Sequence, residues 1–154
     1  MTEVSFHFNV PDRSDYTCRL VRKAMKAGAS VVLTGPAAAL AQFDRMLWIF
    51  EPLEFLPHVM LRAGQAVPDR LRATKVWLTE DASQAEHHDV LVNLGVDAPA
   101  GFESFARVIE IVAPDEADRA AARLRWKHYA ARGYSIQKHE WAREPRSADC
   151  KVLR

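Results

Sequence analysis

Three cations recur every four residues near the C-terminal end of the chain, at Arg119, Arg123 and Lys127. Side chains four residues apart lie on one face of an α-helix, so these three would form a cationic stripe. Trp126 follows Arg123 by three residues and lies beside this stripe. Arginine can hold a carboxylate through two parallel hydrogen bonds, and lysine adds a point charge. The spacing therefore favours a site for a carboxylate attached to an apolar group.

The same pattern allows two other interpretations. A solvated basic face, with Trp126 half-buried against a sheet, has the same spacing, and spacing alone does not separate it from a binding site. Clusters of basic and aromatic residues also bind single-stranded nucleic acid. Asp115 and Asp118 precede the stripe, where the helix dipole favours acids, and they weaken the nucleic-acid signal.

The charge distribution indicates an anionic partner at one end of the molecule. From Arg119 to the last residue there are ten Lys or Arg and three Asp or Glu. This part therefore carries a formal charge of about +7, and the rest carries about −6. The partner could be nucleic acid, an acidic peptide or a membrane surface.

No motif for nucleotide, metal or covalent chemistry is present. Residues 34–39 (Thr-Gly-Pro-Ala-Ala-Ala) join a predicted strand to a predicted helix, but lack the second glycine, the lysine and the Ser/Thr of a phosphate loop. The six histidines show no metal-ligand spacing, and no G-x-S-x-G occurs. Cys18 and Cys150 are far apart, which predicts two reduced, structurally inert thiols. We expect no cofactor, no metal and no catalytic activity.

Residues 44–58 form an apolar connection with two prolines that cannot continue a helix, so the preceding helix should end near Phe50. Apolar side chains on irregular backbone either fill the core from above or form a docking patch for another protein. Trp48 and Phe55 are of the residue types that anchor interfaces.

Alternating strands and helices should position these candidate sites. Short apolar runs at residues 31–34, 76–79, 90–94 and 107–112 are typical of strands buried on both faces. Residues 4–10 alternate apolar and polar side chains, as a half-buried strand does. This order predicts a single α/β domain with a largely parallel sheet flanked by helices.

Three helices are predicted between the strands. The first should start with Ser14 or Asp15 as its N-cap and end at Gly28, the second should start at Gly35-Pro36, and the third should run from Asp115 to about Arg132.

The chain's 154 residues, 49% of them hydrophobic and 27% charged, suit one domain, which we place at residues 1–141. Residues 142–154 lack periodicity and are predicted to be a flexible tail. No apolar run is long enough to span a membrane, and no basic leader precedes the first strand, so we expect a cytoplasmic protein without a membrane partner.

Several segments form a combination more specific than any of them alone. They are Leu47-Trp48, residues 55–58 (Phe-Leu-Pro-His), 89–94 (Asp-Val-Leu-Val-Asn-Leu) and 123–129 (Arg-Leu-Arg-Trp-Lys-His-Tyr), Gly133-Tyr134, and the early residues 16–20 and 23–24. Together they resemble the chi subunit family of bacterial DNA polymerase III, which are clamp-loader accessory proteins. The resemblance extends from Phe6 to about Trp141.

The resemblance implies a fold similar to nucleotide-binding proteins but without nucleotide activity, and a non-catalytic role in DNA replication. It also implies two partners. One is the psi subunit, which links chi to the clamp loader. The other is the single-stranded DNA-binding protein, through an acidic C-terminal tail that ends in phenylalanine with its free carboxylate. The association with single-stranded DNA would then be indirect.

By the same resemblance, Trp48 and Phe55 match positions that contact psi, whereas Arg123, Trp126 and Lys127 match positions that bind the tail. Arg123 and Lys127 would take the carboxylate. Trp126, with the apolar turn at residues 112–114, would enclose the phenyl ring. The alternatives are direct binding of single-stranded nucleic acid by the basic C-terminal end, and an enzyme on a nucleotide-binding-like fold, against which the missing phosphate loop argues.

Overall fold

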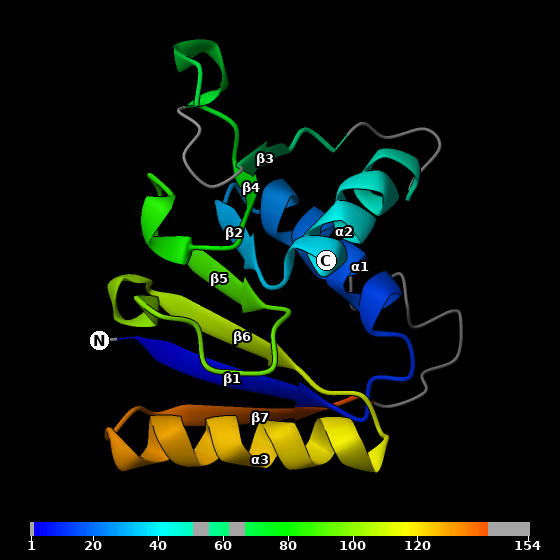
Figure 1. Cartoon of the computed structure of the whole chain (residues 1–154), viewed down its shortest axis with the longest axis vertical. Helices are drawn as coiled ribbons and strands as arrows, with labels where there is room; N and C mark the ends of the chain where they lie inside the picture. The colour runs from blue at the N-terminus through cyan, green and yellow to red at the C-terminus, as the bar shows by residue number, and fades with distance from the viewer. Residues whose placement is uncertain (1, 51–55, 62–66, 142–154) are drawn as a thin grey trace.

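Seven parallel strands form one sheet in the computed structural model, which describes residues 2–50, 56–61 and 67–141 (Figure 1). Their order across the sheet is β3-β4-β2-β5-β6-β1-β7. The strands are β1 (Glu3–Phe8), β2 (Val31–Thr34), β3 (Val59–Leu61), β4 (Val76–Thr79), β5 (Val90–Asn93), β6 (Arg107–Ile111) and β7 (Ile136–Glu140). The helices are α1 (Arg13–Lys26), α2 (Ala37–Ile49) and α3 (Glu116–Ala131), with short 3₁₀ turns η1 (Asp69–Leu71), η2 (Ala82–Gln84) and η3 (Phe102–Ser104).

The predicted α/β fold with a parallel sheet flanked by helices is confirmed. No helix within the described ranges is long and apolar enough to cross a membrane. The proposed domain limits, residues 1–141, stay a prediction, and the predicted tail at residues 142–154 lies outside the described residues.

The helices cover opposite faces of the sheet at opposite ends (Figure 1). Apolar side chains of α1 and α2, such as Val21 and Phe43, pack with Val31 of β2 and Val92 of β5. On the other face, α3 lies over β6 and β1, where the Trp126 and Phe6 rings are 5.0 Å apart. On the α1 side of the sheet, His7 of β1 contacts Tyr16 of α1.

Three local predictions differ from the structure. Helix α1 begins at Arg13, and its N-cap is Asp12, whose carboxylate accepts a hydrogen bond from the Asp15 backbone N–H at 3.0 Å. Asp12 has the extended backbone that an N-cap needs, so the predicted caps Ser14 and Asp15 fall inside the first turn. Strands β3 and β7 were not predicted, because β3 has three residues and β7 has mostly exposed, polar side chains.

Cys18 is a free, buried thiol on α1. Burial, with a smaller contribution from the nearby carboxylates of Asp15 and Asp12, raises its pKa to about 12. The thiolate, which is the reactive form, is therefore suppressed, in agreement with the predicted inert role. Cys150 lies outside the described residues.

His7 on β1 points toward α1, where its Nδ1 atom is hydrogen-bonded to the hydroxyl of Tyr16. Burial, with the nearby charges of His139, Lys23 and Arg107, lowers the pKa of His7 from 6.5 to about 4. The folded protein therefore binds a proton at His7 less readily than the unfolded chain does.

We expect His7 to make the protein less stable in mild acid. Its contribution to the free energy of unfolding is fully present above about pH 6.5 and is lost as the pH falls toward about 4. Thermal unfolding of the wild type and of His7→Gln across this range checks it. The two curves of stability against pH should diverge, with the shallower slope for His7→Gln. Both proteins keep the other histidines, including His87, whose pKa is also lowered, so only His7 can make the two curves differ. Parallel curves would therefore contradict the prediction.

Candidate protein-binding surfaces

The start of α3 is fixed by two aspartates. The Asp115 carboxylate accepts a hydrogen bond from the Asp118 backbone N–H at 3.1 Å, which makes Asp115 the N-cap. The Asp118 carboxylate accepts from the Ala113 backbone N–H at 2.6 Å and lies 3.3 Å from Nη1 of Arg13. These contacts set the rotation of α3 about its axis, and therefore which of its side chains face solvent.

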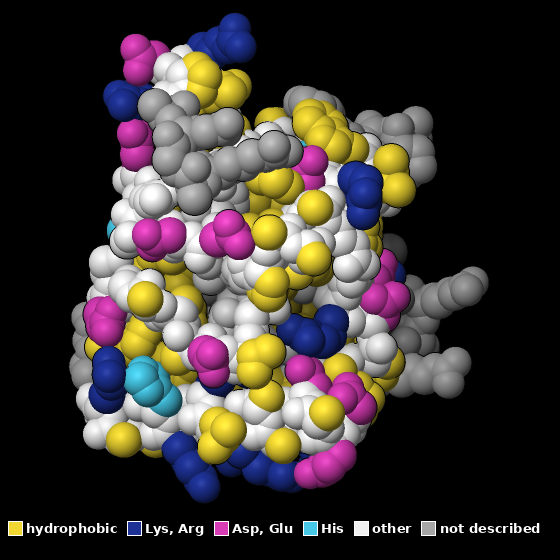
Figure 2. Space-filling view, in the orientation of Figure 1, with side chains coloured by type: hydrophobic (Ala, Val, Ile, Leu, Met, Phe, Trp, Pro, Cys, Tyr) yellow, Lys and Arg dark blue, Asp and Glu magenta, His cyan; other side chains and the backbone are white. Residues whose placement is uncertain are grey.

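The predicted cationic stripe lies on the solvent-facing side of α3. Arg119, Arg123 and Lys127 are exposed. Figure 2 shows Lys and Arg side chains gathered along the edge of the molecule where α3 lies, with hydrophobic side chains beside them. Trp126 is half-buried at the border of the stripe, packed against Phe6. The helix thus brings the three predicted tail-binding residues together on one surface, which we call the α3 surface: Arg123, Trp126 and Lys127.

A fourth cation joins the α3 surface from a different element. Nζ of Lys138 on β7 lies 5.1 Å from the centroid of the Trp126 ring, within the range of a cation–π contact. Sequence reasoning missed Lys138 because β7 was not predicted. Residues 136–140 carry little signal for a strand; Lys138 is placed by the pairing of β7 with β1, in which it lies opposite Phe6.

Arg123 is held only loosely by its own helix. Its Nη1 atom lies 3.0 Å from Oε1 of Glu116, and the two side chains are 59% and 74% exposed. Exposed pairs of this kind contribute about 0–1 kcal/mol. A bound carboxylate can therefore replace Glu116 as the partner of Arg123 at little cost.

Arg125 is a third arginine on α3, and sequence reasoning did not assign it a role. Its side chain is 3% exposed, and its Nε atom donates to the Glu110 carboxylate of β6 at 2.8 Å. The same carboxylate accepts hydrogen bonds from Asn93 at 2.9 Å and from the Tyr129 hydroxyl at 2.7 Å. Burial raises the pKa of Glu110, and these three donors oppose that shift. The sequence did hold one signal for this contact: Glu110 lies within the apolar run 107–112, and a carboxylate buried in a strand needs a cation facing it.

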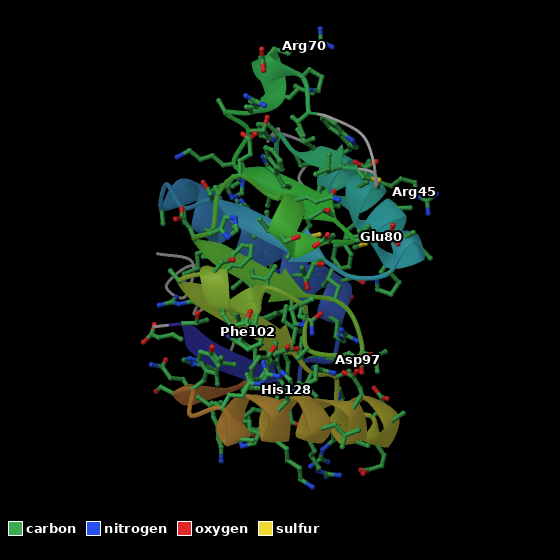
Figure 3. All side chains as sticks on the ribbon, turned by 60° about the vertical axis from the view of Figure 1, so that its left-hand side comes forward. Arg45, Arg70, Glu80, Asp97, Phe102 and His128 are labelled. Carbon is green, nitrogen blue, oxygen red and sulfur yellow. The ribbon has the colours of Figure 1, made fainter. Side chains whose placement is uncertain are left out.

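Arg125 also fixes the loop after β5 against α3. Its Nη1 atom donates to the Val96 carbonyl at 2.9 Å. Figure 3 shows Asp97 of this loop on the same side of the molecule as His128 of α3, and the His128 ring lies 6.1 Å from that of Phe102. The position of α3 is therefore determined by one buried charge pair and by aromatic contacts.

The predicted psi contact Trp48 lies in the last turn of α2 and is 50% exposed. Its neighbour Ile49 is 75% exposed. The core-filling interpretation fits Leu47 and Leu56, which are buried, but not Trp48. Phe55, the other predicted psi contact, lies outside the described residues.

His58 links α2 to the segment before β3 through hydrogen bonds. Its side chain is fully buried, with Nδ1 2.7 Å from the Leu56 carbonyl and Nε2 2.9 Å from the Asp44 carboxylate. The Trp48 ring lies 4.5 Å from the His58 ring. The half-exposed Trp48 indole thus packs on the buried, hydrogen-bonded ring of His58.

Comparison with known proteins identifies the family of the chain. The profile of a family described as "DNA polymerase III chi subunit, HolC" matches residues 1–137. The chain belongs to this family. It is 32% identical, over 93% of its length and 99% of the relative's, to DNA polymerase III subunit chi of Pseudomonas aeruginosa. It is 27% identical, over 79% of its length and 83% of the relative's, to the protein of that name from Haemophilus influenzae. Membership in the chi family makes the chain an accessory component of DNA replication.

The chi-family chain carries acidic groups where nucleotide-binding α/β proteins hold phosphates. A cavity of about 400 Å³ lies at the carboxyl ends of β2, β4 and β5, lined in part by Glu80, Asp81 and Asp97. Two of these, Glu80 and Asp97, are labelled in Figure 3. Gly35 lies so close to the loop after β5 that a Cβ there would be 3.0 Å from Cβ of Leu94. The three carboxylates make this cavity electrostatically unfavourable for an anion.

Within the described part of the chain, no group of three His, Cys, Asp or Glu side chains could hold a metal ion. The residues predicted to bind partners lie on two described surfaces: the α3 surface and the exposed end of α2 around Trp48.

Proposed function

We propose that the protein is a non-catalytic adaptor in the cytoplasm. It would join the polymerase III clamp loader, through a psi subunit, to the acidic C-terminal tail of single-stranded DNA-binding protein. One observation above all supports this proposal: α2 and α3 lie on opposite faces and at opposite ends of the sheet (Figure 1). Two partners could therefore bind at the same time without competing.

The α3 surface has the chemistry that such a tail requires. Arg123 and Lys127 supply exposed positive charge for the terminal carboxylate, and Trp126 supplies an aromatic wall for the phenyl ring. Val112, in the turn that leads into α3, belongs to the apolar cluster against which Trp126 packs. Binding of this kind should be modest in affinity and should weaken as salt is added.

A bridging assay tests the adaptor. Beads carrying a peptide that is acidic and ends in phenylalanine should retain psi only when the chain is also present. Trp48→Ala should abolish the retention of psi, while the chain itself still binds the beads. Since Trp48 is half-exposed, the loss of stability should be about 1 kcal/mol, which is a few degrees in melting temperature.

The matched control is Trp48→Phe, which keeps an aromatic ring at the end of α2 and should retain part of the psi signal. Full retention of psi by Trp48→Ala would remove Trp48 from the psi interface. A fall in melting temperature of about 10 °C would instead assign Trp48 to the stability of the fold.

Direct binding of single-stranded nucleic acid is the competing function. The exposed cations of α3 favour it, but Glu116 lies 3.0 Å from Arg123, and Glu103 lies 3.4 Å from Arg132. These carboxylates reduce the net charge available to phosphates. An oligonucleotide titrated at the same ionic strength as the tail peptide separates the two functions, and tighter binding of the oligonucleotide would contradict the adaptor.

A further inference from the structure

A second cavity lies on the face of the sheet away from α3. Its volume is about 530 Å³, which is within the usual range for small-molecule sites. It lies between α1 and the strands β5, β6, β1 and β7. We call it the α1 groove.

The floor of the α1 groove is aliphatic. Val90 and Val92 of β5 and Ile109 of β6 line it from the sheet, and Leu20 and Ala24 line it from α1. Such a floor suits an aromatic ring or a branched aliphatic chain, whose burial would release water from these side chains.

The rim of the groove is basic. Lys23, Arg107, His7 and His139 all line it, and none of its lining residues is an aspartate or glutamate. The Lys23 side chain is exposed at this rim. Arg107 has only an exposed contact to Glu3 at 3.5 Å, which contributes little.

The basic groups are close enough to act on one another. The His7 and His139 rings are 4.7 Å apart, and the charges of His139, Lys23 and Arg107 all help to lower the pKa of His7. His7 is uncharged near neutral pH, so the positive charge of the rim comes from Lys23 and Arg107, and none of the residues lining the groove is a carboxylate. An anion in the groove would therefore be attracted by Lys23 and Arg107.

We propose that the α1 groove is a binding site for a small organic carboxylate with an aromatic or branched aliphatic body, held at its carboxylate end by Lys23 and Arg107 and at its apolar end by the aliphatic floor. The site is separate from the α3 surface, because the two lie on opposite faces of the sheet. The proposal is therefore independent of the adaptor function.

An NMR titration of the full chain tests the site. The probe is N-acetyl-L-phenylalanine, and its neutral counterpart N-acetyl-L-phenylalanine amide has the same body without the charge. The carboxylate should shift the signals of Leu20, Val90 and Ile109, and should bind roughly tenfold more tightly than the amide. Equal affinities for the two probes, or shifts confined to α3, would overturn the proposal.

Two sets of variants locate the probe. Lys23→Gln with Arg107→Gln replaces exposed side chains, so the protein should fold normally and bind the carboxylate about tenfold more weakly. Ala24→Met keeps every charge but fills the groove, and should also prevent binding. The control, Arg123→Gln with Lys127→Gln, should leave the affinity unchanged. Unchanged affinity in both groove variants, or equal loss in the α3 control, would show that the probe does not bind in the α1 groove.

Discussion

Replacing Arg125 by alanine is expected to destabilise the protein by about 3–5 kcal/mol, because it leaves the buried Glu110 carboxylate without its cation. Asn93 and Tyr129 would still donate hydrogen bonds to that carboxylate, but neither carries charge. The loss of the contact from Arg125 to Val96 would also release the loop after β5 from α3. Urea unfolding of the variant and the wild type measures the difference.

The same helix offers a matched control. Arg123 lies two residues earlier and differs from Arg125 mainly in exposure, since it pairs with the exposed carboxylate of Glu116. Arg123→Ala should change the free energy of unfolding by less than about 1 kcal/mol. Equal effects of the two substitutions would contradict the assigned roles. Combining Arg125→Met with Glu110→Gln should recover part of the loss, since it removes the uncompensated charge.

Arg123→Ala combined with Lys127→Ala is expected to lower the affinity for an acidic peptide ending in phenylalanine by at least about tenfold, and more at low salt. The two side chains supply exposed positive charge beside Trp126, and a further cation, Lys138, is placed there by β7. Titration calorimetry or fluorescence anisotropy with a labelled peptide measures the affinity.

Two comparisons make this result specific. Amidation of the peptide's C-terminus should weaken binding to the wild type but have little effect on the double variant, because the carboxylate's partners are then absent. Glu116→Gln should strengthen binding by about two- to threefold, since it frees Arg123 and removes a negative charge. If the double variant binds as tightly as the wild type, the tail binds elsewhere.

The central strands were predictable because each is a continuous apolar run. Strands β2 and β4 have the predicted limits, and β5 and β6 differ by one residue. A strand covered on both faces needs apolar side chains at nearly every position, so a short continuous apolar run indicates such a strand. The edge strand β7 was missed for the opposite reason: four of its five side chains are exposed, so burial imposes no pattern on its sequence.

The α3 surface was predictable only in part. Helical periodicity correctly grouped Arg119, Arg123 and Lys127, but periodicity does not tell which face points outward. Arg125 and Tyr129 lie on the buried face of α3, where both donate hydrogen bonds to Glu110 of β6. These contacts depend on where α3 crosses the sheet, which the helical period does not give. Lys138 could not be placed beside Trp126 from the sequence, because it lies on β7, a strand whose sequence gives little signal.

The place of β1 in the sheet has a consequence for how the protein folds during synthesis. The first strand pairs with β6 and β7, so Val4 lies opposite Val108 and Ile136, more than 100 residues further along the chain. The inner strands β2, β4 and β5 pair with one another over shorter separations and can assemble earlier. Until β6 and β7 have left the ribosome, β1 has apolar side chains without a partner strand, and non-local pairing of this kind slows folding. The nascent chain is therefore expected to be most prone to aggregation in the interval after β5 has emerged and before β7 has.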